Sequence, residues 1–187
     1  MNKEIIDKAI IYLVLNNKDN DLNCVYNSIE MAHILSDLTS DTDIVVAGLL
    51  RNLIIDPNTN IEEIISIFGK DIVSLVIRNI DIDRSNYSSF RDINTARINF
   101  LKDQNIKEKM IIFASNLVNL RNLNNKYEEL GDNIFIQEYF DKLDLCWYFS
   151  SILEQCNMFK DSIYYREYKS LLISVFSTRT YSKKIDF

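Results

Sequence analysis

The sequence contains few of the residues that make turns: only 3 glycines and 1 proline occur among its 187 residues. A fold built from many short strands needs turn residues at frequent intervals, so this scarcity argues against a β-sandwich or barrel. Long helices joined by short polar loops need far fewer. Because 47% of the residues are hydrophobic, the chain can also bury a sizeable core, which argues against a disordered protein.

Positive charge is scarce as well. The chain has 21 Lys and Arg against 27 Asp and Glu, which gives a net charge of -6. Nucleic-acid binding depends on clustered Lys and Arg, so we expect no nucleic-acid partner. The longest apolar run, Ile44 to Leu50, is far shorter than the roughly 20 residues that a membrane-spanning helix needs. With no signal-peptide pattern at the start of the sequence, these features predict a cytoplasmic protein with no membrane contact.

Cysteine and histidine are too few, and too scattered, to form common catalytic or metal-binding motifs. Cys24, Cys146 and Cys156 form no CxxC pair, and an odd number of cysteines favours reduced thiols in a cytosol. His33 is the only histidine, so neither a Ser-His-Asp nor a Cys-His catalytic arrangement is supported.

Apolar residues recur at helical spacing along the whole chain. We expect a buried helix through IVVAGLLRNLII, a break at Asp56-Pro57-Asn58, one long aromatic helix from Ile134 to about Cys156, and a last helix over residues 162–176. Residues of the types that cap helices precede several of these segments: Asp41 or Thr42, Thr59 with Glu62, Ser88 or Ser89, and Asn105 with Glu108. We therefore predict one all-α domain over residues 1–187, a bundle of eight or nine helices.

One segment of the chain resembles a known family. Residues 47–76 read AGLLRNLIIDPNTNIEEIISIFGKDIVSLV, which is similar to HD-domain phosphohydrolases of the RelA/SpoT type, the (p)ppGpp hydrolases, and to their small single-domain relatives. In that family an apolar helix carries Leu-Leu-His-Asp, two apolar residues and Glu-Asp, and a short acidic helix ends in Phe-Gly. Here Leu50 is followed by Arg51-Asn52, Ile55-Asp56 holds the acidic pair's place, and Phe68-Gly69 ends the segment.

Two later segments extend the resemblance. FASNLVNLRNL (113–123) is similar to the family helix with the usual form Ala-Asp-Arg-Leu-His-Asn-Met-Arg, and YEELGDNIFIQEYFDKLDLCWYF (127–149) is similar to the C-terminal helices of the small branch. The resemblance covers roughly residues 5–176. It implies an HD-like helical bundle.

The resemblance also implies a divalent metal, such as manganese, held by two His and two Asp. The matching positions are all substituted: Asn27, Arg51, Asn52 and Ser115. Amides and a hydroxyl bind such a metal weakly, and Arg51 has no lone pair to donate and stays protonated. A guanidinium about 5 Å from a divalent ion would cost about 6 kcal/mol at an effective dielectric constant near 20. We therefore predict no metal cofactor and no metal-dependent catalysis.

Other family positions are partly kept. Asp56 remains from the catalytic acidic pair, although a residue before proline also fits a simple turn. Asn119 and Arg121 match family positions near the nucleotide, and Lys18 is the best match to a basic pair near the first loop. With Arg51, these residues are candidates for binding a ligand. Hydrogen bonding between helices is the alternative explanation for Asn119 and Arg121.

Three hypotheses follow. The first is a catalytically degenerate HD-type protein that binds a nucleotide or another phosphate-bearing small molecule, or acts as an interaction module. The second is an active phosphohydrolase for (p)ppGpp or another nucleotide, with a relocated metal site that recruits Asp56, Glu30 or Asp43. The third is a structural or partner-binding helical protein that forms a homo-oligomer through its aromatic C-terminal helices.

Overall fold

The structure is a computed structural model that describes residues 1–17, 22–77, 89–137 and 141–177. Within these residues the chain forms ten α-helices, one short 3-10 helix and no strand, so the predicted all-α fold is confirmed. The α-helices are α1 (Lys3–Asn16), α2 (Leu22–Leu38), α3 (Thr42–Ile54), α4 (Ile61–Phe68), α5 (Lys70–Ile77), α6 (Phe90–Lys102), α7 (Ile106–Leu130), α8 (Asn133–Gln137), α9 (Lys142–Gln155) and α10 (Ile163–Phe176).

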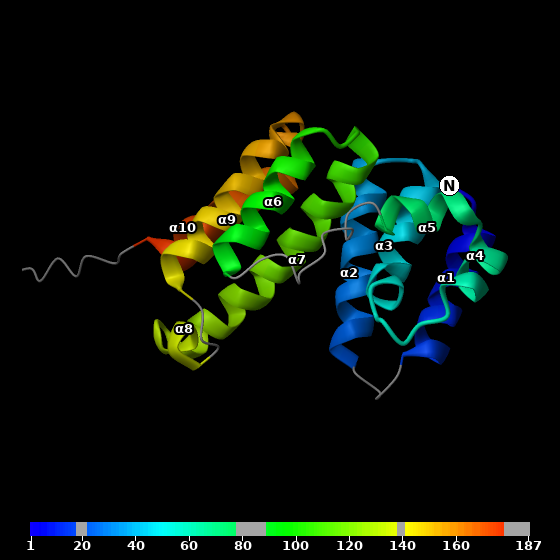
Figure 1. The fold of residues 1–187 in the computed structure, drawn as a ribbon, viewed down its shortest axis with the longest axis horizontal. Helices are drawn as coiled ribbons and strands as arrows, with labels where there is room; N and C mark the ends of the chain where they lie inside the picture. Colours follow the sequence, from blue (N-terminus) through cyan, green and yellow to red (C-terminus); the bar gives the residue numbers. More distant parts are fainter. Residues whose placement is uncertain (18–21, 78–88, 138–140, 178–187) are drawn as a thin grey trace, which may run out of the picture.

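The helices form two halves that meet along α2 and α7. Figure 1 shows α1 to α5 gathered in one half and α6 to α10 in the other. In the first half α3 packs against α1, α2 and α5, and in the second half α7 packs against α9 and α10. Both α2 and α3 also contact α7. Side chains on these three helices can therefore point into one shared region.

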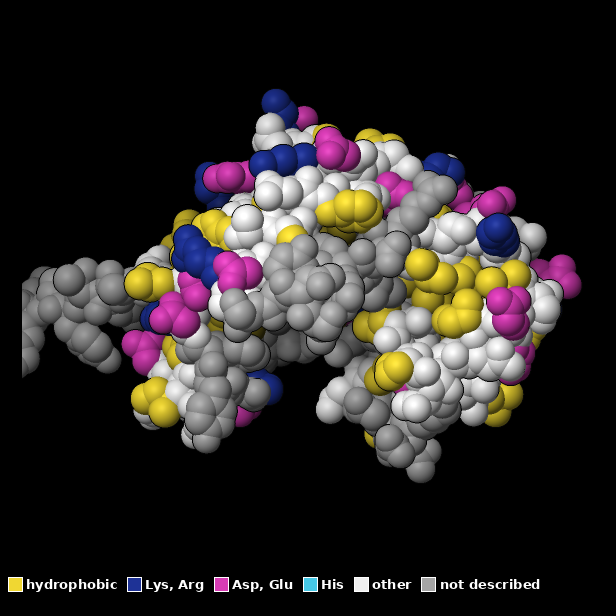
Figure 2. Space-filling view, in the orientation of Figure 1, with side chains coloured by type: hydrophobic (Ala, Val, Ile, Leu, Met, Phe, Trp, Pro, Cys, Tyr) yellow, Lys and Arg dark blue, Asp and Glu magenta, His cyan; other side chains and the backbone are white. Residues whose placement is uncertain are grey.

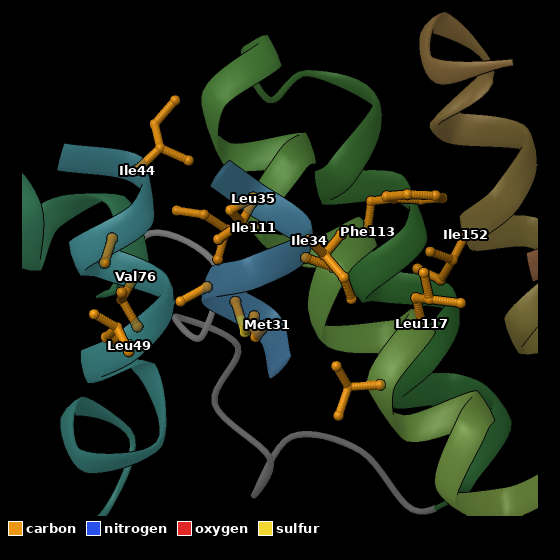
Figure 3. Packing of buried hydrophobic residues seen from close by; sticks show 14 of the residues in the cluster. Met31, Ile34, Leu35, Ile44, Leu49, Val76, Ile111, Phe113, Leu117 and Ile152 are labelled. Atoms are coloured by element: carbon orange, nitrogen blue, oxygen red, sulfur yellow. The ribbon is translucent and has the colours of Figure 1, made fainter. Parts of the chain in front are cut away.

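The core runs through this junction. Figure 3 shows Ile34 and Leu35 of α2 lying between Leu49 of α3 on one side and Phe113 and Leu117 of α7 on the other, and all five side chains are buried. Burying a side chain of this size contributes about 1.5–3 kcal/mol relative to leaving it exposed. The apolar stripes of α2, α3 and α7 are thus what hold the two halves together.

A glycine lets α2 and α3 approach closely. A Cβ placed on Gly48 would lie 2.4 Å from Cδ1 of Leu35, a distance at which the leucine would have to move. The lack of a side chain at this position therefore leaves room for Leu35 between the helices that carry Asn27 and Arg51.

Several expected helix starts are confirmed. Asp41 is the N-cap of α3, where its side chain accepts a hydrogen bond from the backbone N–H of Asp43 at 3.1 Å. Ser89 caps α6. Asn105 and Glu108 form a complete capping box at the start of α7. Ser88, the other residue considered for α6, lies outside the described residues.

Two local predictions are wrong. Thr59 does not cap α4; Asn60 does, with its side chain accepting from the backbone N–H of Glu63 at 3.3 Å. The reason is that Thr59 belongs to the preceding turn, since its backbone N–H donates to the carbonyl of Asp56 at 3.0 Å.

The expected aromatic helix from Ile134 to Cys156 is two helices, α8 and α9. A new helix starts after Asp141, because Asp141 is the N-cap of α9. Its side chain accepts a hydrogen bond from the backbone N–H of Asp144 at 2.9 Å. Phe135 and Phe149 are buried, so these aromatic side chains pack in the core. Tyr139 and Phe140 lie outside the described residues.

The surface carries both signs of charge. Figure 2 shows Lys, Arg, Asp and Glu side chains interspersed over α6 and α9, and apolar side chains gathered over α4 and α5. Among the helices described, none combines the length and the apolar character needed to cross a membrane.

Candidate functional site

The four positions predicted from the family resemblance to match metal ligands lie on helices that pack together: Asn27 on α2, Arg51 and Asn52 on α3, and Ser115 on α7. Two of them make hydrogen bonds between helices. Asn27 accepts from Nδ2 of Asn122 on α7 at 3.0 Å. Asn52 donates from Nδ2 to the hydroxyl of Ser28 on α2 at 3.1 Å. The amides at these positions therefore connect α2 to α7 and to α3.

Arg51 differs from these amides because it makes no such hydrogen bond to any residue that the structure describes. Its side chain is partly buried, and its Nε is shielded from solvent and makes no hydrogen bond. Within the described part of the chain no carboxylate forms an ion pair with it. Burial has the largest effect on the pKa of the Arg51 guanidinium and lowers it. The nearby Tyr148 raises this pKa, and the positive charge of Arg97 lowers it. An arginine nonetheless keeps its charge at neutral pH.

Arg97 and Tyr148 are close enough to Arg51 to influence its pKa, and Asn116 is close to Tyr148; none of the three was predicted as a site residue. Burial raises the pKa of Tyr148 on α9. Three neighbours act in the opposite direction: the charge of Arg97 on α6, a hydrogen bond with the Asn116 amide on α7, and the charge of Arg51. Asn116 is 6% exposed, and its Oδ1 has no hydrogen-bond partner. We call Arg51, Arg97, Asn116 and Tyr148 the cationic cluster.

No local motif could have revealed this cluster, because its members come from four separate helices. The Nη1 of Arg97 donates to Oδ1 of Asn94 on its own helix at 3.1 Å. Tyr148 and Asn116 lie in segments that resemble the family, but neither was predicted as a site residue.

Arg121, a predicted ligand contact, is engaged by two carboxylates. Its Nε and Nη2 donate to the two oxygens of Glu167 on α10 at 2.6 and 2.5 Å, and its Nη1 donates to Glu30 on α2 at 2.6 Å. Burial acts to lower the pKa of Arg121, but the hydrogen bonds and charges of Glu167 and Glu30 outweigh it and raise that pKa above its usual value. We call Arg121, Glu30 and Glu167 the carboxylate-paired group; it ties α2, α7 and α10 together.

Asn119 faces a cavity beside α7. The cavity has a volume of about 230 Å³, smaller than the roughly 300–1,000 Å³ typical of pockets for drug-sized ligands. It is lined by Asn119, Asn122, Leu123 and Lys126 of α7, Ile134 of α8, and Leu145 and Phe149 of α9. Amides and a lysine beside an apolar wall suit a flat ring that carries polar atoms.

Asp56 has a structural explanation. Its Oδ1 accepts hydrogen bonds from the backbone N–H and from Nδ2 of Asn58, at 2.8 and 3.1 Å, as in a turn that ends a helix. A second cavity, of about 270 Å³, lies beside it and is mostly lined by isoleucines and Pro57. Lys18 lies outside the described residues.

The residues at the site do not fit a divalent metal. Within the described ranges no three His, Cys, Asp or Glu side chains are grouped so that they could hold a metal ion. Glu30 is bonded to Arg121, and Asp43 and His33 are exposed. The side chains that are present offer amide, hydroxyl and guanidinium groups, which are poor ligands for Mg²⁺, Mn²⁺ or Zn²⁺.

The helical bundle, with α3 and α7 facing α2, is the architecture of an HD-type phosphohydrolase. The chain belongs to the HD domain family, which matches residues 12–139. Among solved structures, it is similar to Lmo0812 from Listeria monocytogenes EGD-e, with 23% identity and a TM-score of 0.66 over 80% of this chain and 98% of that one.

It is also similar to a metazoan ortholog of SpoT, a protein that hydrolyses ppGpp and plays a role in starvation responses. The identity is 18% and the TM-score 0.64, over 88% of this chain and 91% of that chain. At these identities the likeness establishes the fold. No curated protein sequence matches this chain.

Proposed function

We propose that this protein is a catalytically degenerate HD domain that binds a nucleotide or another phosphate-bearing small molecule without metal-dependent hydrolysis. The observation that carries the proposal is Arg51. It is a partly buried cation whose Nε has no hydrogen-bond partner within the described residues, and the family resemblance matches it to a metal-binding histidine.

The loss of hydrolysis follows from the chemistry of the substituted positions. A divalent metal in an HD site activates the water that attacks the phosphate ester. Asn27 and Asn52 instead bond to Asn122 and Ser28, and Arg51 brings a charge that repels a metal ion. Without the metal, no described side chain in this region is placed to generate hydroxide.

Two features support an anionic, ring-bearing ligand. The cationic cluster offers charge and hydrogen-bond donors of the kind that phosphate oxygens accept. The cavity beside Asn119 offers an apolar wall with amides at its edge, suited to a base. The metazoan SpoT ortholog with a similar fold acts on ppGpp, so guanine nucleotides carrying several phosphates are the first ligands to test.

The test is a thermal-shift titration of the protein, in EDTA, with adenine and guanine nucleotides, including (p)ppGpp. We expect at least one nucleotide to raise the melting temperature; at about 100 times its Kd a ligand stabilises the folded state by about 2.7 kcal/mol. Phosphate release should stay at background with added Mn²⁺. No shift with any nucleotide would contradict ligand binding, and turnover that depends on Mn²⁺ would favour an enzyme with a relocated metal site.

A further inference from the structure

Two asparagines, Asn27 of α2 and Asn122 of α7, connect a predicted metal position to the cavity beside α7. Nδ2 of Asn122 donates to Oδ1 of Asn27 at 3.0 Å, and Asn122 also lines the cavity. A side-chain amide has its donor on one branch and its acceptor on the other. Because the donor branch is held by Asn27, Oδ1 of Asn122 is left to accept a hydrogen bond from a molecule in the cavity, and it accepts none from the described residues.

The rest of the lining suits one flat ring. Leu123, Ile134, Leu145 and Phe149 form an apolar wall, against which an aromatic ring packs favourably. The cavity of about 230 Å³ has the space of about eight water molecules at about 30 Å³ each. A single ring system fits in that space, while the sugar and phosphates of a nucleotide lie outside it. Lys126 also lines the cavity, and its positive charge disfavours a ligand whose donor is an ammonium group.

We infer that the cavity binds an aromatic ring that carries a neutral amino group, and that this amino group donates to Oδ1 of Asn122. Asn27 is a positioning residue, because it fixes the direction of the Asn122 amide without touching the ligand. The inference rests on the proposed function and narrows it to nucleotides whose base carries an amino group, as adenine and guanine do. A position that the family resemblance matches to a metal ligand thus takes part in selecting the base.

The test compares nucleotides that differ only by the amino group: GTP with ITP, and ATP with purine riboside triphosphate. Each is titrated calorimetrically into the full chain in EDTA. Both members of a pair carry the same phosphates, so the ratio of their Kd values isolates the amino group. We expect the member with the amino group to bind about tenfold more tightly in at least one pair, because its counterpart leaves an acceptor unpaired in the cavity. A ratio near one in both pairs would overturn the inference.

Variants of the two asparagines test their separate roles. Asn122→Leu keeps a similar shape without the acceptor, so the ratio should fall from about tenfold to about one. Asn27→Asp still accepts from Nδ2 of Asn122 and should keep the ratio, whereas Asn27→Leu frees the amide and should lower the ratio to about threefold. The matched control is Asn125→Leu, which removes an exposed asparagine of α7 outside the described lining and should behave as the wild type does.

An unchanged ratio in Asn122→Leu would contradict the contact with the amino group. An unchanged ratio in Asn27→Leu, or an equal loss in Asn27→Asp, would contradict the positioning role of Asn27. The wild-type ratio needs no variant, so it tests the amino-group contact even if a leucine variant fails to fold.

This inference and the proposed function fail in different ways. If the two members of each pair bind equally, nucleotide binding stands and the amino-group contact is wrong. Adenosine with purine riboside, and guanosine with inosine, form the same comparison without phosphates. If a nucleoside with the amino group binds more tightly than its counterpart but no nucleotide binds, the cavity site stands and phosphate recognition is wrong. If no nucleoside and no nucleotide binds, both are wrong.

Discussion

Two arginines, Arg51 in α3 and Arg121 in α7, lie in opposite electrostatic surroundings. Arg121 donates to three carboxylate oxygens of Glu30 and Glu167, whereas Nε of Arg51 donates to none. The pKa of Arg121 is raised above its usual value because its partners outweigh burial, and that of Arg51 is lowered because burial dominates.

The difference shows how a paired cation can be distinguished from a binding cation within one fold. The contacts of Arg121 are satisfied by α2 and α10, so holding helices together accounts for its position. Arg51 has a charge but no partner within the described residues, so the fold alone does not account for it. The two residues should therefore respond to the same substitution with opposite signs.

The largest effect on stability is expected from Arg121→Met. This change leaves Glu30 and Glu167 side by side without a cation, and breaking a partly buried charge network costs about 2–3 kcal/mol. Urea unfolding should show a lower midpoint with an unchanged slope. Arg166→Met is the control and should change stability by less than about 0.5 kcal/mol. A stable Arg121→Met protein would mean that the carboxylate-paired group does not hold α10 in place.

A smaller effect is expected when one carboxylate of that group is neutralised. Glu167→Gln should cost about 1–1.5 kcal/mol, because Glu167 bonds to Arg121 through both oxygens, and Glu30→Gln should cost about 0.5 kcal/mol, because it bonds through one. The same urea experiment measures both changes. Equal costs, or a larger cost for Glu30→Gln, would show that the bidentate geometry does not determine the strength of the pair.

An effect that is seen only at high pH concerns Tyr164, which lies beside Arg121 and donates to Oδ2 of Asp37 at 2.6 Å. Burial and this hydrogen bond raise the pKa of Tyr164 from 10.0 to about 12. Since the folded-state pKa is the higher one, the contribution of Tyr164 to stability is complete below pH 10 and is lost as the pH rises towards 12.

At pH 11 the loss amounts to about 1 kcal/mol. Tyr164→Phe lacks an ionisable group, so its free energy of unfolding should fall less steeply than that of the wild type between pH 10 and 12. Parallel curves for the two proteins, from unfolding measured at several pH values, would contradict the raised pKa.

Features set by neighbouring residues were predictable from the sequence. The capping box of Asn105 and Glu108 needs only two side chains three positions apart, and it forms as expected. The start of α4 was misplaced by one residue, because the turn after Pro57 holds Thr59. The end of α8 was missed, since the aromatic pattern continues through the segment and only Asp141 marks a new start.

The candidate site was only partly predictable for a related reason. The four positions could be proposed as substituted metal positions because a family resemblance aligned them, and α2, α3 and α7 do pack together. Arg97 and Tyr148 come from α6 and α9, and no spacing in the sequence links them to Arg51. The position of Arg121 on its helix was predictable, but its pairing with the carboxylate of Glu167, 46 residues further along the chain, was not.

The central claim is that a cation of the chain has replaced the metal ion, and metal content tests it most directly. Wild type and a variant carrying Asn27→His, Arg51→His, Asn52→Asp and Ser115→Asp are dialysed against Mn²⁺, freed of loosely bound ions and measured by elemental analysis. The account predicts almost no Mn²⁺ in the wild type and about one ion per chain in the variant, which restores two His and two Asp. One tightly bound ion per wild-type chain would contradict it.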